Sequence, residues 1–518
     1  MSTAQQNPPE KMSEQTQDGT KASVTSASDQ LDRLSDSIAS GVVFAVLLTV
    51  GQRVVGFIRG ILFCRIMSDQ ELGQWSMLWS FLMLLAPLAV LGLPGCFSRY
   101  TEYYRHRGQL RTFIQRIAVV SLGLTLALVT AMLIFPERVS WMIFRDSSHV
   151  TIVYALAISL AIVSASNFLS SLLESLRQVR AVTAMRFITG VGFAVFGTLM
   201  IAYSTNRSAA AALAYGISCV LGAIPAIWFL YKYRNCIVDE TESENLRHST
   251  MWKKIAPFAA WLWVSNLFHN LFEVSDRYML IHWSKTTADM AQGYVGQYHS
   301  GRVVPLLMVS VAGVIGGLLL PYMSAAWEKG EREDARRQSN WSVKLLALAF
   351  TAGGIVVLFL SPVLFEGIFQ GKYNDGLAVL PLTLVYCIWF GLAVVAQNYL
   401  WVAEKGSWAA IAMGIGLGAN IVLNMLLIPP YGLEGAVIAT TLGNASNLIV
   451  VYLFNNSQGC KIDFGMWMVS AMPLLLILPL PVAALAFVAV AVATVMTEFV
   501  FTAEEKSDVI GMVSKLRK

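Results

Sequence analysis

The sequence contains few charged residues for its length of 518: Asp, Glu, Lys and Arg make up 13% of it, whereas hydrophobic residues make up 56%. A soluble domain contains about 25% charged residues. The six cysteines are scattered, with neither the spacing of a metal site nor a disulfide framework. The chain also contains no Walker motif, no HExxH and no nucleophile elbow. We therefore expect a membrane protein that is not an enzyme, with no cofactor, no metal site and no nucleic-acid partner.

Long apolar runs divide the chain into membrane spans, because about 20 apolar residues cross a bilayer as a helix. The segment 465–502 is too long for one span and contains prolines, so we expect two short spans hinged near Pro479. The sequence predicts an all-α polytopic membrane protein with two six-helix lobes plus a C-terminal helix pair, about 14 transmembrane helices in all. The other expected spans lie near 41–63, 75–97, 114–135, 150–172, 183–204, 209–231, 255–281, 298–320, 342–362, 377–400, 407–428 and 434–454.

Polar segments between the apolar runs predict how the chain is organised. We divide it into a disordered cytoplasmic tail (1–37), an N-lobe (38–231), a cytoplasmic linker (232–254), a C-lobe (255–456), a terminal helix pair (457–503) and a cytoplasmic amphipathic tail (504–518).

The two lobes share sequence features at a nearly constant offset. Gly73-Gln74-Trp75 corresponds to Gly296-Gln297-Tyr298, and Gly108 corresponds to Gly330 within a charged loop. Such duplicated halves are typical of transporters. We expect the two charged loops to be solvated cytoplasmic surfaces; contact with anionic lipid headgroups is the alternative.

The distribution of basic residues predicts the orientation. Of the 37 lysines and arginines, 26 lie in segments on the same side as the N-terminus and 6 in loops on the other side. The positive-inside rule therefore places both termini in the cytoplasm. The first apolar run continues into a full span, so we expect no signal peptide. This pattern favours the inner (cytoplasmic) membrane of a bacterium.

Few ionisable residues fall inside the expected spans, where each costs about 2.5–3.5 kcal/mol at the helix centre. Arg53 is the hardest to explain as an interfacial residue, because it lies near the middle of its span; we expect it to line a polar cavity. A surplus of arginine over acid favours an anionic substrate, since guanidinium groups bind phosphate in a forked geometry. The complete set is Arg53, Arg59, Arg116, Glu273, Asp276, Arg277 and Arg302.

The seventh span carries a polar stripe of Asn266, Asn270, Glu273 and Arg277, with Asp276 beside it. The first and seventh spans open the two lobes, so their polar groups would converge if the lobes face each other.

Other roles for these groups stay open. Arg59, Arg116 and Arg302 could instead reach a headgroup layer. Asp276 could form a buried structural pair with an arginine. The amides of later spans, such as Asn420 and Asn424, are expected to hydrogen-bond between helices.

Several segments resemble polysaccharide and lipid-linked oligosaccharide flippases of the multidrug/oligosaccharidyl-lipid/polysaccharide (MOP) exporter superfamily. The most specific match is IPPYGLEGAVIATTLGN (428–444), similar to the turn before span 12 of that family. The resemblance covers roughly residues 38 to 510. The other matching segments are ILFCRIMSDQELGQWSMLW (61–79), SDRYMLIHW (275–283), LLLPYMSAAWEKGE (318–331) and TAEEKSDVI (502–510).

The resemblance implies two lobes in a V around a central cavity, alternating access, and movement of an undecaprenyl-pyrophosphate-linked oligosaccharide to the outer leaflet. It implies as partners the lipid-linked oligosaccharide, membrane lipids, and glycosyltransferase or polymerase proteins. Together with the polar stripe, it gives Arg53, Arg59, Arg302 and Asn270 as candidates for substrate binding. Asp276, Arg277 and Glu273 are the candidates for coupling or gating, with H+ or Na+ as the candidate coupling ion.

Three alternatives stay open at this point. A multidrug/cation antiporter would need a surplus of carboxylates in the cavity. A peptidoglycan-precursor flippase cannot be separated from the leading hypothesis by motifs alone. A membrane scaffold of a polysaccharide-synthesis complex would transport nothing.

Overall fold

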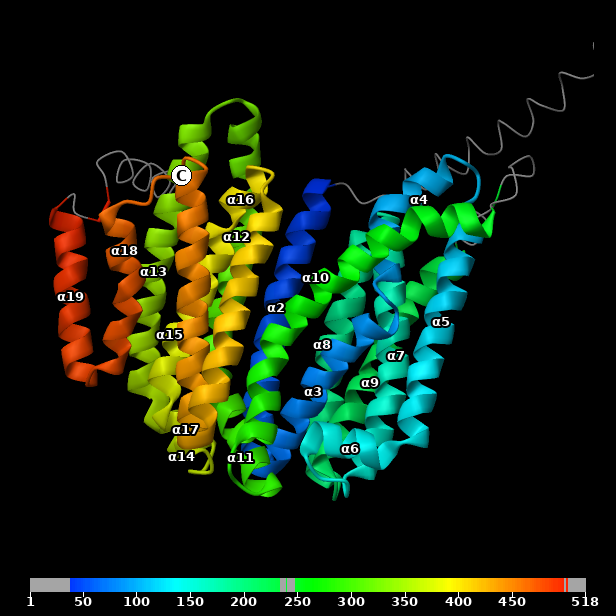
Figure 1. Ribbon diagram of the computed structural model, residues 1–518, viewed down its shortest axis with the longest axis horizontal. Coiled ribbons are helices and arrows are strands. Elements are labelled where there is room, and N and C mark those ends of the chain that lie inside the picture. Colours follow the sequence, from blue (N-terminus) through cyan, green and yellow to red (C-terminus); the bar gives the residue numbers. More distant parts are fainter. Residues whose placement is uncertain (1–37, 233–238, 240–246, 498–499, 502–518) are drawn as a thin grey trace, which may run out of the picture.

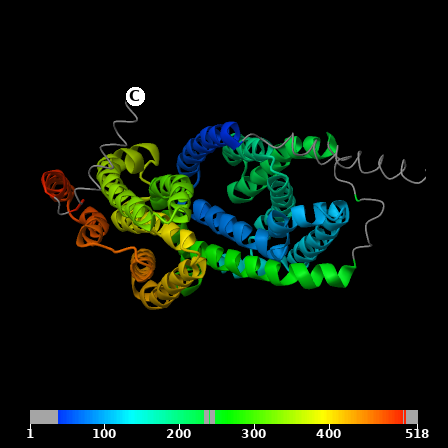
Figure 2. The same ribbon diagram turned by 90° about the horizontal axis from the view of Figure 1, so that it is seen from above.

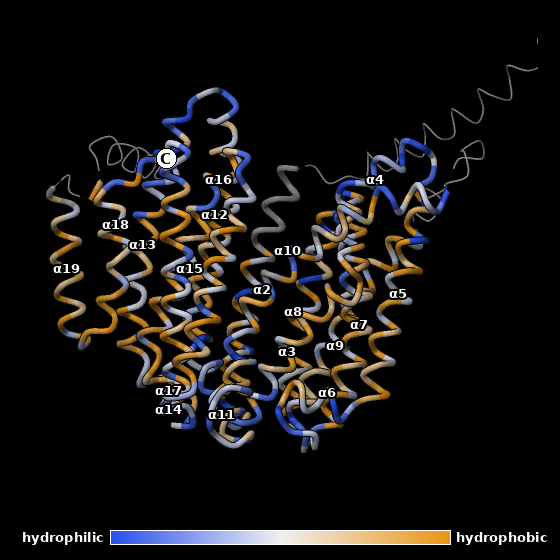
Figure 3. Tube along the Cα trace, viewed as in Figure 1, coloured by the Kyte–Doolittle hydropathy of each residue, from blue (hydrophilic) through white to orange (hydrophobic). Residues whose placement is uncertain are grey.

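The structure is a computed structural model that describes residues 38–232, 239, 247–497 and 500–501. The expected tails 1–37 and 504–518, and most of the linker, lie outside this part. Within it every regular element is a helix, and nine helices are long and apolar enough to cross a membrane. The middle of the molecule is hydrophobic, whereas the turns at both ends are hydrophilic (Figure 3). The protein is therefore an all-α polytopic membrane protein, as predicted.

Two helical bundles stand side by side and lean apart toward one end of the molecule (Figure 1). We call that end, which carries α4 and the α12–α13 turn, the α4 end; the opposite end, which carries α6 and α11, is the α11 end. The first bundle, the N-lobe, contains α2 (Ile38–Ile66), α3 (Asp69–Ala89), η1 (Leu93–Cys96), α4 (Phe97–Arg105), α5 (Leu110–Ile134), α6 (Pro136–Phe144), α7 (Val150–Ser175), α8 (Val179–Tyr203) and α9 (Arg207–Lys232).

The second bundle, the C-lobe, departs from the expected spans at one place and agrees with the break expected at another. The span expected at 298–320 is two helices, because Pro305 begins a new helix and has no backbone N–H to continue the previous one. The two spans expected on either side of 429–433 are joined by a sharp kink at Gly432 (φ 54°, ψ −122°). The helices of the C-lobe are α10 (His248–Trp283), α11 (Ala288–Arg302), α12 (Pro305–Glu328), α13 (Arg332–Pro362), η3 (Val363–Ile368), α14 (Asn374–Ala378), α15 (Leu380–Ala396), α16 (Asn398–Val402) and α17 (Gly406–Ser457).

The C-terminal segment forms two short helical arms, as predicted. The first arm is α18 (Phe464–Ala471) with η4 (Met472–Ile477), and the second is α19 (Leu480–Met496); the chain turns at Pro479 between them. The indole of Trp389 in α15 donates a 2.7 Å hydrogen bond to the Ser470 carbonyl, which attaches the first arm to the C-lobe. The pair lies at the outer edge of that lobe (Figures 1 and 2).

The helix α10 crosses from one bundle to the other (Figure 2). Near its start, Met251, Ile255 and Ala259 pack in one hydrophobic cluster with Phe97 and Tyr104 of the N-lobe. Its second half packs against α17 of the C-lobe. A displacement of one lobe relative to the other must therefore bend or tilt α10.

The lobes touch backbone to backbone at the α11 end. A Cβ atom on Gly73 of α3 would lie 1.8 Å from the Gln292 carbonyl oxygen, and one on Gly296 of α11 would lie 1.8 Å from the Asp69 carbonyl oxygen. Only glycine permits this approach of two helices. These are the glycines that the sequence repeat pairs, so the repeat-related helices meet each other.

Candidate functional site

A buried polar network surrounds Asp276 in the second half of α10. Its carboxylate accepts hydrogen bonds from Asn420 Nδ2, Asn424 Nδ2 and Thr440 Oγ1, each 2.8 Å long. A fourth comes from the Tyr298 hydroxyl at 2.9 Å. No ion pair joins Asp276 to an arginine among the residues that the structure describes. The carboxylate is thus satisfied by neutral donors, and the hydrogen bonds tie α10 to α11 and to both halves of α17.

A small cavity of about 30 Å³ adjoins this carboxylate. Its lining includes Asp276, Thr440 and Asn444, whose side chains carry oxygen atoms, and also Arg302, whose positive charge opposes a cation there. The amide oxygens of Asn424 and Asn444 are buried and have no hydrogen-bond partner in the described part of the chain. One water needs about 10–15 Å³. The cavity therefore has room for one or two waters or a small desolvated cation.

Three arginines surround His299 where the lobes meet. Arg59 of α2 lies with its guanidinium carbon 4.2 Å from the ring centroid of Phe193. Arg277 of α10 donates to the Ser80 hydroxyl of α3, and Arg302 lies 5.2 Å from the ring centroid of Tyr298. All three arginines are within electrostatic range of His299. Positive charge from both lobes is therefore concentrated at one place.

His299 joins the lobes by a side-chain contact. Its Nδ1 lies 3.1 Å from the Ser76 hydroxyl of α3. Ser76 and His299 each follow the paired glycines, Gly73 and Gly296, by three residues. The contact thus lies between equivalent positions of the two repeats.

The other expected site residues lie outside this cluster. Arg53 is exposed on α2 and makes no hydrogen bond or ion pair with any described residue. The Asn270 amide donates to the Asn266 carbonyl of its own helix at 2.7 Å. The side chain of Glu273 lies outside the described part of the structure. Arg302 is buried, with 6% of its surface exposed, so it does not reach a headgroup layer.

Sequence reasoning missed part of the site. Tyr298 and His299 follow the repeated Gly-Gln pair, and that repeat was the available signal for them. Asn420 and Asn424 do hydrogen-bond to another helix, as expected, but their acceptor is the Asp276 carboxylate. Spacing alone does not reveal that acceptor.

Contacts at the α11 end close the site on that side. Arg145 of the α6–α7 loop donates 3.1 Å hydrogen bonds to the carbonyls of Ile281, Ser284 and Thr286, at and beyond the end of α10. The side chain of Gln74 donates to that of Gln292 at 2.9 Å. The lobes are thus joined at the α11 end and diverge toward the α4 end.

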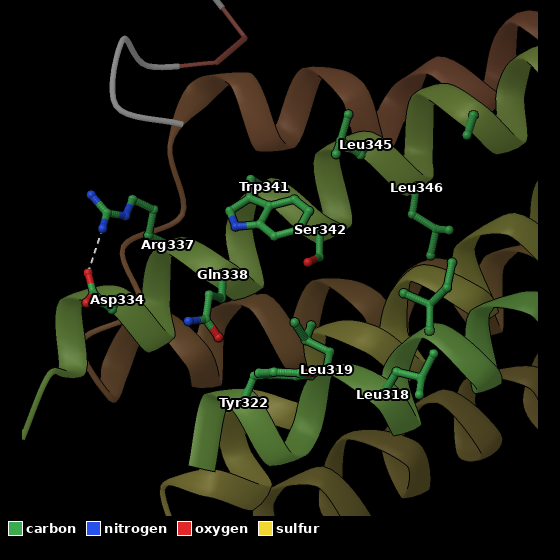
Figure 4. A pocket seen from close by; sticks show the side chains of 12 residues that line it. Leu318, Leu319, Tyr322, Asp334, Arg337, Gln338, Trp341, Ser342, Leu345 and Leu346 are labelled. Carbon is green, nitrogen blue, oxygen red and sulfur yellow. Dashed lines mark hydrogen bonds and ion pairs between the residues drawn. The ribbon is translucent and has the colours of Figure 1, made fainter. Parts of the chain in front are cut away.

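A larger groove of about 770 Å³ lies between α12 and α13 (Figure 4). Its wall is mainly apolar and includes Leu318, Leu319, Trp341 and Leu345. Tyr322 at its edge is 71% exposed. The groove contains none of the Arg59, Asp276 and Arg302 side chains, so we place the candidate site at the lobe junction.

Two helical repeats joined at one end around buried charges are the architecture of a membrane transporter. The chain matches the family of polysaccharide biosynthesis proteins over residues 38–327, more than half of its length, and it belongs to this family. That family places it in the MOP superfamily.

Two curated relatives from Bacillus subtilis (strain 168) are similar to this chain. The uncharacterized membrane protein YabM is 24% identical over 419 residues, which cover 78% of this chain and 77% of YabM. The lipid II flippase MurJ is 21% identical over 457 residues, covering 81% of this chain and 82% of MurJ.

Solved structures share the fold. A lipid II flippase MurJ in an inward closed conformation has a TM-score of 0.62 at 14% identity, covering 84% of this chain and 92% of MurJ. A multidrug resistance MATE family transporter of the MOP superfamily in an inward-facing conformation has a TM-score of 0.61 at 15% identity. The match covers 79% of this chain and 94% of the MATE transporter.

Proposed function

We propose that the protein is a flippase that moves a polyprenyl-pyrophosphate-linked oligosaccharide from the inner to the outer leaflet for polysaccharide export. The observation that carries this proposal is the group of arginines from both lobes, Arg59, Arg277 and Arg302, around His299. Guanidinium groups bind phosphate oxygens through paired N–H donors, so such a group suits a pyrophosphate. Membership of the polysaccharide biosynthesis family supports a glycan as the other part of the substrate.

The α4 end faces the cytoplasm in this proposal, because the excess of lysine and arginine lies on that side. Both termini are then cytoplasmic, and the membrane is the inner membrane of a bacterium. The closed α11 end makes the present conformation inward-facing. Transport requires the lobes to separate there, which breaks the contacts of Arg145 and Gln74 across the boundary.

The Asp276 network is the proposed coupling site, with H+ or Na+ as the ion. A carboxylate, two amide groups and a hydroxyl are the hard oxygen ligands that such a cation prefers. The amides of Asn420 and Asn424 now present N–H to Asp276, so binding a metal ion would turn their oxygens inward. Because α10 carries Asp276 and packs against both lobes, a change at the site would act directly on the crossing helix.

A drug/cation antiporter is less well supported. An organic-cation substrate would need a surplus of carboxylates at its binding site, whereas three arginines lie at the lobe junction near Asp276. The nearby arginines repel organic cations. A non-transporting scaffold does not need the arginine group. The experiment described next, which substitutes Arg302, therefore tests the scaffold hypothesis as well.

The test uses cells that lack this protein and measures polyprenyl-pyrophosphate-linked oligosaccharide in lipid extracts, with its leaflet distribution. We expect the oligosaccharide to accumulate in the cytoplasmic leaflet. The intact protein should reverse this accumulation; Arg302→Gln should fail at equal protein abundance, and Arg302→Lys should recover only part. Altered sensitivity to cationic drugs without accumulation would support the antiporter instead. Full rescue by Arg302→Gln would contradict the proposed binding site.

A further inference from the structure

Four exposed cations form one surface at the α4 end of the N-lobe. Arg99 and Arg107 come from α4 and the turn after it, and Lys253 and Lys254 come from the first turns of α10. We call these four residues the N-lobe cationic surface. None of them forms an ion pair with a carboxylate in the described part of the chain.

Aromatic rings hold three of these cations in place. The Lys254 ammonium lies 3.2 Å from the ring centroid of Tyr103. The guanidinium carbon of Arg107 lies 4.4 Å from the same centroid. Arg99 lies 5.4 Å from the ring centroid of Phe258 on α10. A ring attracts a cation without neutralising it and leaves its N–H groups available to an anion. The surface is thus preorganised and keeps its charge.

Two nearby carboxylates that the structure describes have other partners. Glu102 pairs with Arg105 at 3.5 Å and with Arg177 at 3.4 Å. Asp239 of the linker accepts hydrogen bonds from the backbone N–H groups of Arg111 and Thr112 at the start of α5. Neither acid neutralises the cationic surface.

The equivalent turn of the C-lobe is built differently. Gly108 and Gly330 occupy equivalent positions and both have positive φ, 61° and 83°. In the C-lobe turn, however, Arg336 pairs with Glu333. Arg337 pairs with Asp334 (Figure 4). Residues 327–338 contain four acidic and four basic residues, whereas residues 97–111 contain one acid and four arginines. The same turn is therefore neutral in one lobe and strongly cationic in the other.

Exposed aromatic residues indicate the depth of this surface in the bilayer. Trp228 and Tyr231, in the last turns of α9 at the same end of the N-lobe, are 61% and 67% exposed. The Lys232 ammonium lies 5.1 Å from the ring centroid of Trp228. Tryptophan and tyrosine concentrate at the headgroup level of a membrane. The α4 end of the N-lobe thus lies at that level.

We propose that the N-lobe cationic surface binds the phosphate headgroups of anionic phospholipids in the leaflet at the α4 end, and that the C-lobe turn does not. Phosphate oxygens match cations that lack carboxylate partners, and basic residues near a charged bilayer surface attract anionic lipids. The position at headgroup depth favours a lipid over an acidic protein. Lipid bound there would anchor α4 together with the first turns of the crossing helix α10.

The test uses the full chain in vesicles of phosphatidylcholine with a minor fraction of labelled phosphatidylglycerol. A photoreactive benzoyl-phenylalanine replaces Ser98, beside Arg99, or in the matched control replaces Glu331 of the C-lobe turn; both positions are exposed. We expect cross-linking at position 98 to favour phosphatidylglycerol by about fivefold over its share of the vesicle. Cross-linking at position 331 should follow the vesicle composition.

Two variants complete the design. Combining Arg99→Gln, Arg107→Gln, Lys253→Gln and Lys254→Gln should remove the enrichment at position 98. Combining Arg99→Lys and Arg107→Lys should retain it and shows that the turn still folds. Equal enrichment at positions 98 and 331, or enrichment that survives the glutamine substitutions, overturns the proposal. Displacement of the lipid by an added acidic peptide at equal charge concentration overturns it in favour of a protein partner.

Discussion

In the C-lobe, the Asp276 carboxylate accepts hydrogen bonds from four neutral side chains, and the buried Lys344 pairs with Asp463 at 2.6 Å. In the N-lobe, Arg59 lies against the ring of Phe193, and Lys254 lies against that of Tyr103. A carboxylate neutralises a cation, whereas a ring attracts it and leaves its charge available. Asp276 and Lys344 of the C-lobe are thus compensated internally, whereas Arg59 and Lys254 keep their positive charge available to other partners.

The comparison shows that duplication of a helical plan need not duplicate its electrostatics. The repeat-related glycines Gly73 and Gly296 lie at the same boundary, and Ser76 contacts His299 from the equivalent position. By the same offset, Asp276 of α10 corresponds to Arg53 of α2, which is exposed. The backbone arrangement is shared, but the charge at an equivalent position has opposite sign. We expect ion coupling at Asp276 to be separable from anion binding at the arginines of the lobe junction.

The largest expected effect comes from breaking internal compensation in the C-lobe. Asp463→Asn keeps the side-chain oxygen that caps α18 through Met466 N–H, but removes the charge beside the buried Lys344 ammonium. We expect a loss of about 3 kcal/mol in the free energy of unfolding, because the change removes a charge partner of a fully buried ammonium. Denaturation of the purified protein in detergent measures it.

The matched control for Asp463→Asn is Glu102→Gln in the N-lobe, whose ion pairs are partly exposed. This change should cost less than about 1 kcal/mol. Similar losses for both variants would show that the two lobes do not differ in how they compensate charge.

Asp276→Asn tests the coupling role directly. We expect oligosaccharide transport to fall about hundredfold, or about 2.7 kcal/mol, and to lose its dependence on pH or Na+, because the amide removes the negative charge that attracts the ion. Transport into vesicles with and without ion gradients measures it. Protein abundance should fall only in part, since the amide oxygen can still accept the hydrogen bonds of one carboxylate oxygen, although the NH2 group then faces the donors of the other. A collapse in abundance with unchanged ion dependence would instead indicate a purely structural role.

The smaller of the two expected effects on transport concerns the N-lobe arginines. Arg59→Gln should reduce transport about tenfold, or about 1.4 kcal/mol, with no change in ion dependence, because it removes one charge-assisted contact to the substrate. Arg59→Lys should recover part of the loss, since an ammonium also lies well against Phe193 but lacks the forked donors. Arg53→Ala should likewise reduce export without lowering abundance. Altered ion dependence in the Arg59 variants would show that anion binding and ion coupling are not separate.

Much of the fold could be predicted from the sequence because lipid imposes strong rules on a single chain. Runs of about 20 apolar residues define helices regardless of their neighbours. Proline and glycine mark local breaks, as at Pro479 between the terminal arms and at Gly432 within α17. The repeated Gly-Gln pair predicted a duplication, and the structure adds that the two helices that carry it meet at the lobe boundary. All of these signals are local or periodic.

Tertiary structure alone decided which charges meet. Helical periodicity places Asp276 on a face of α10, but not opposite Asn420, Asn424 and Thr440, which lie far away in the chain. Arg59 and Phe193 lie in different helices, far apart in the sequence, and packing of α2 on α8 brings them together. The crossing of α10 from one lobe to the other also depends on contacts at both of its ends. Spacing fixes the face of a helix, whereas its neighbour is chosen by packing over the whole chain.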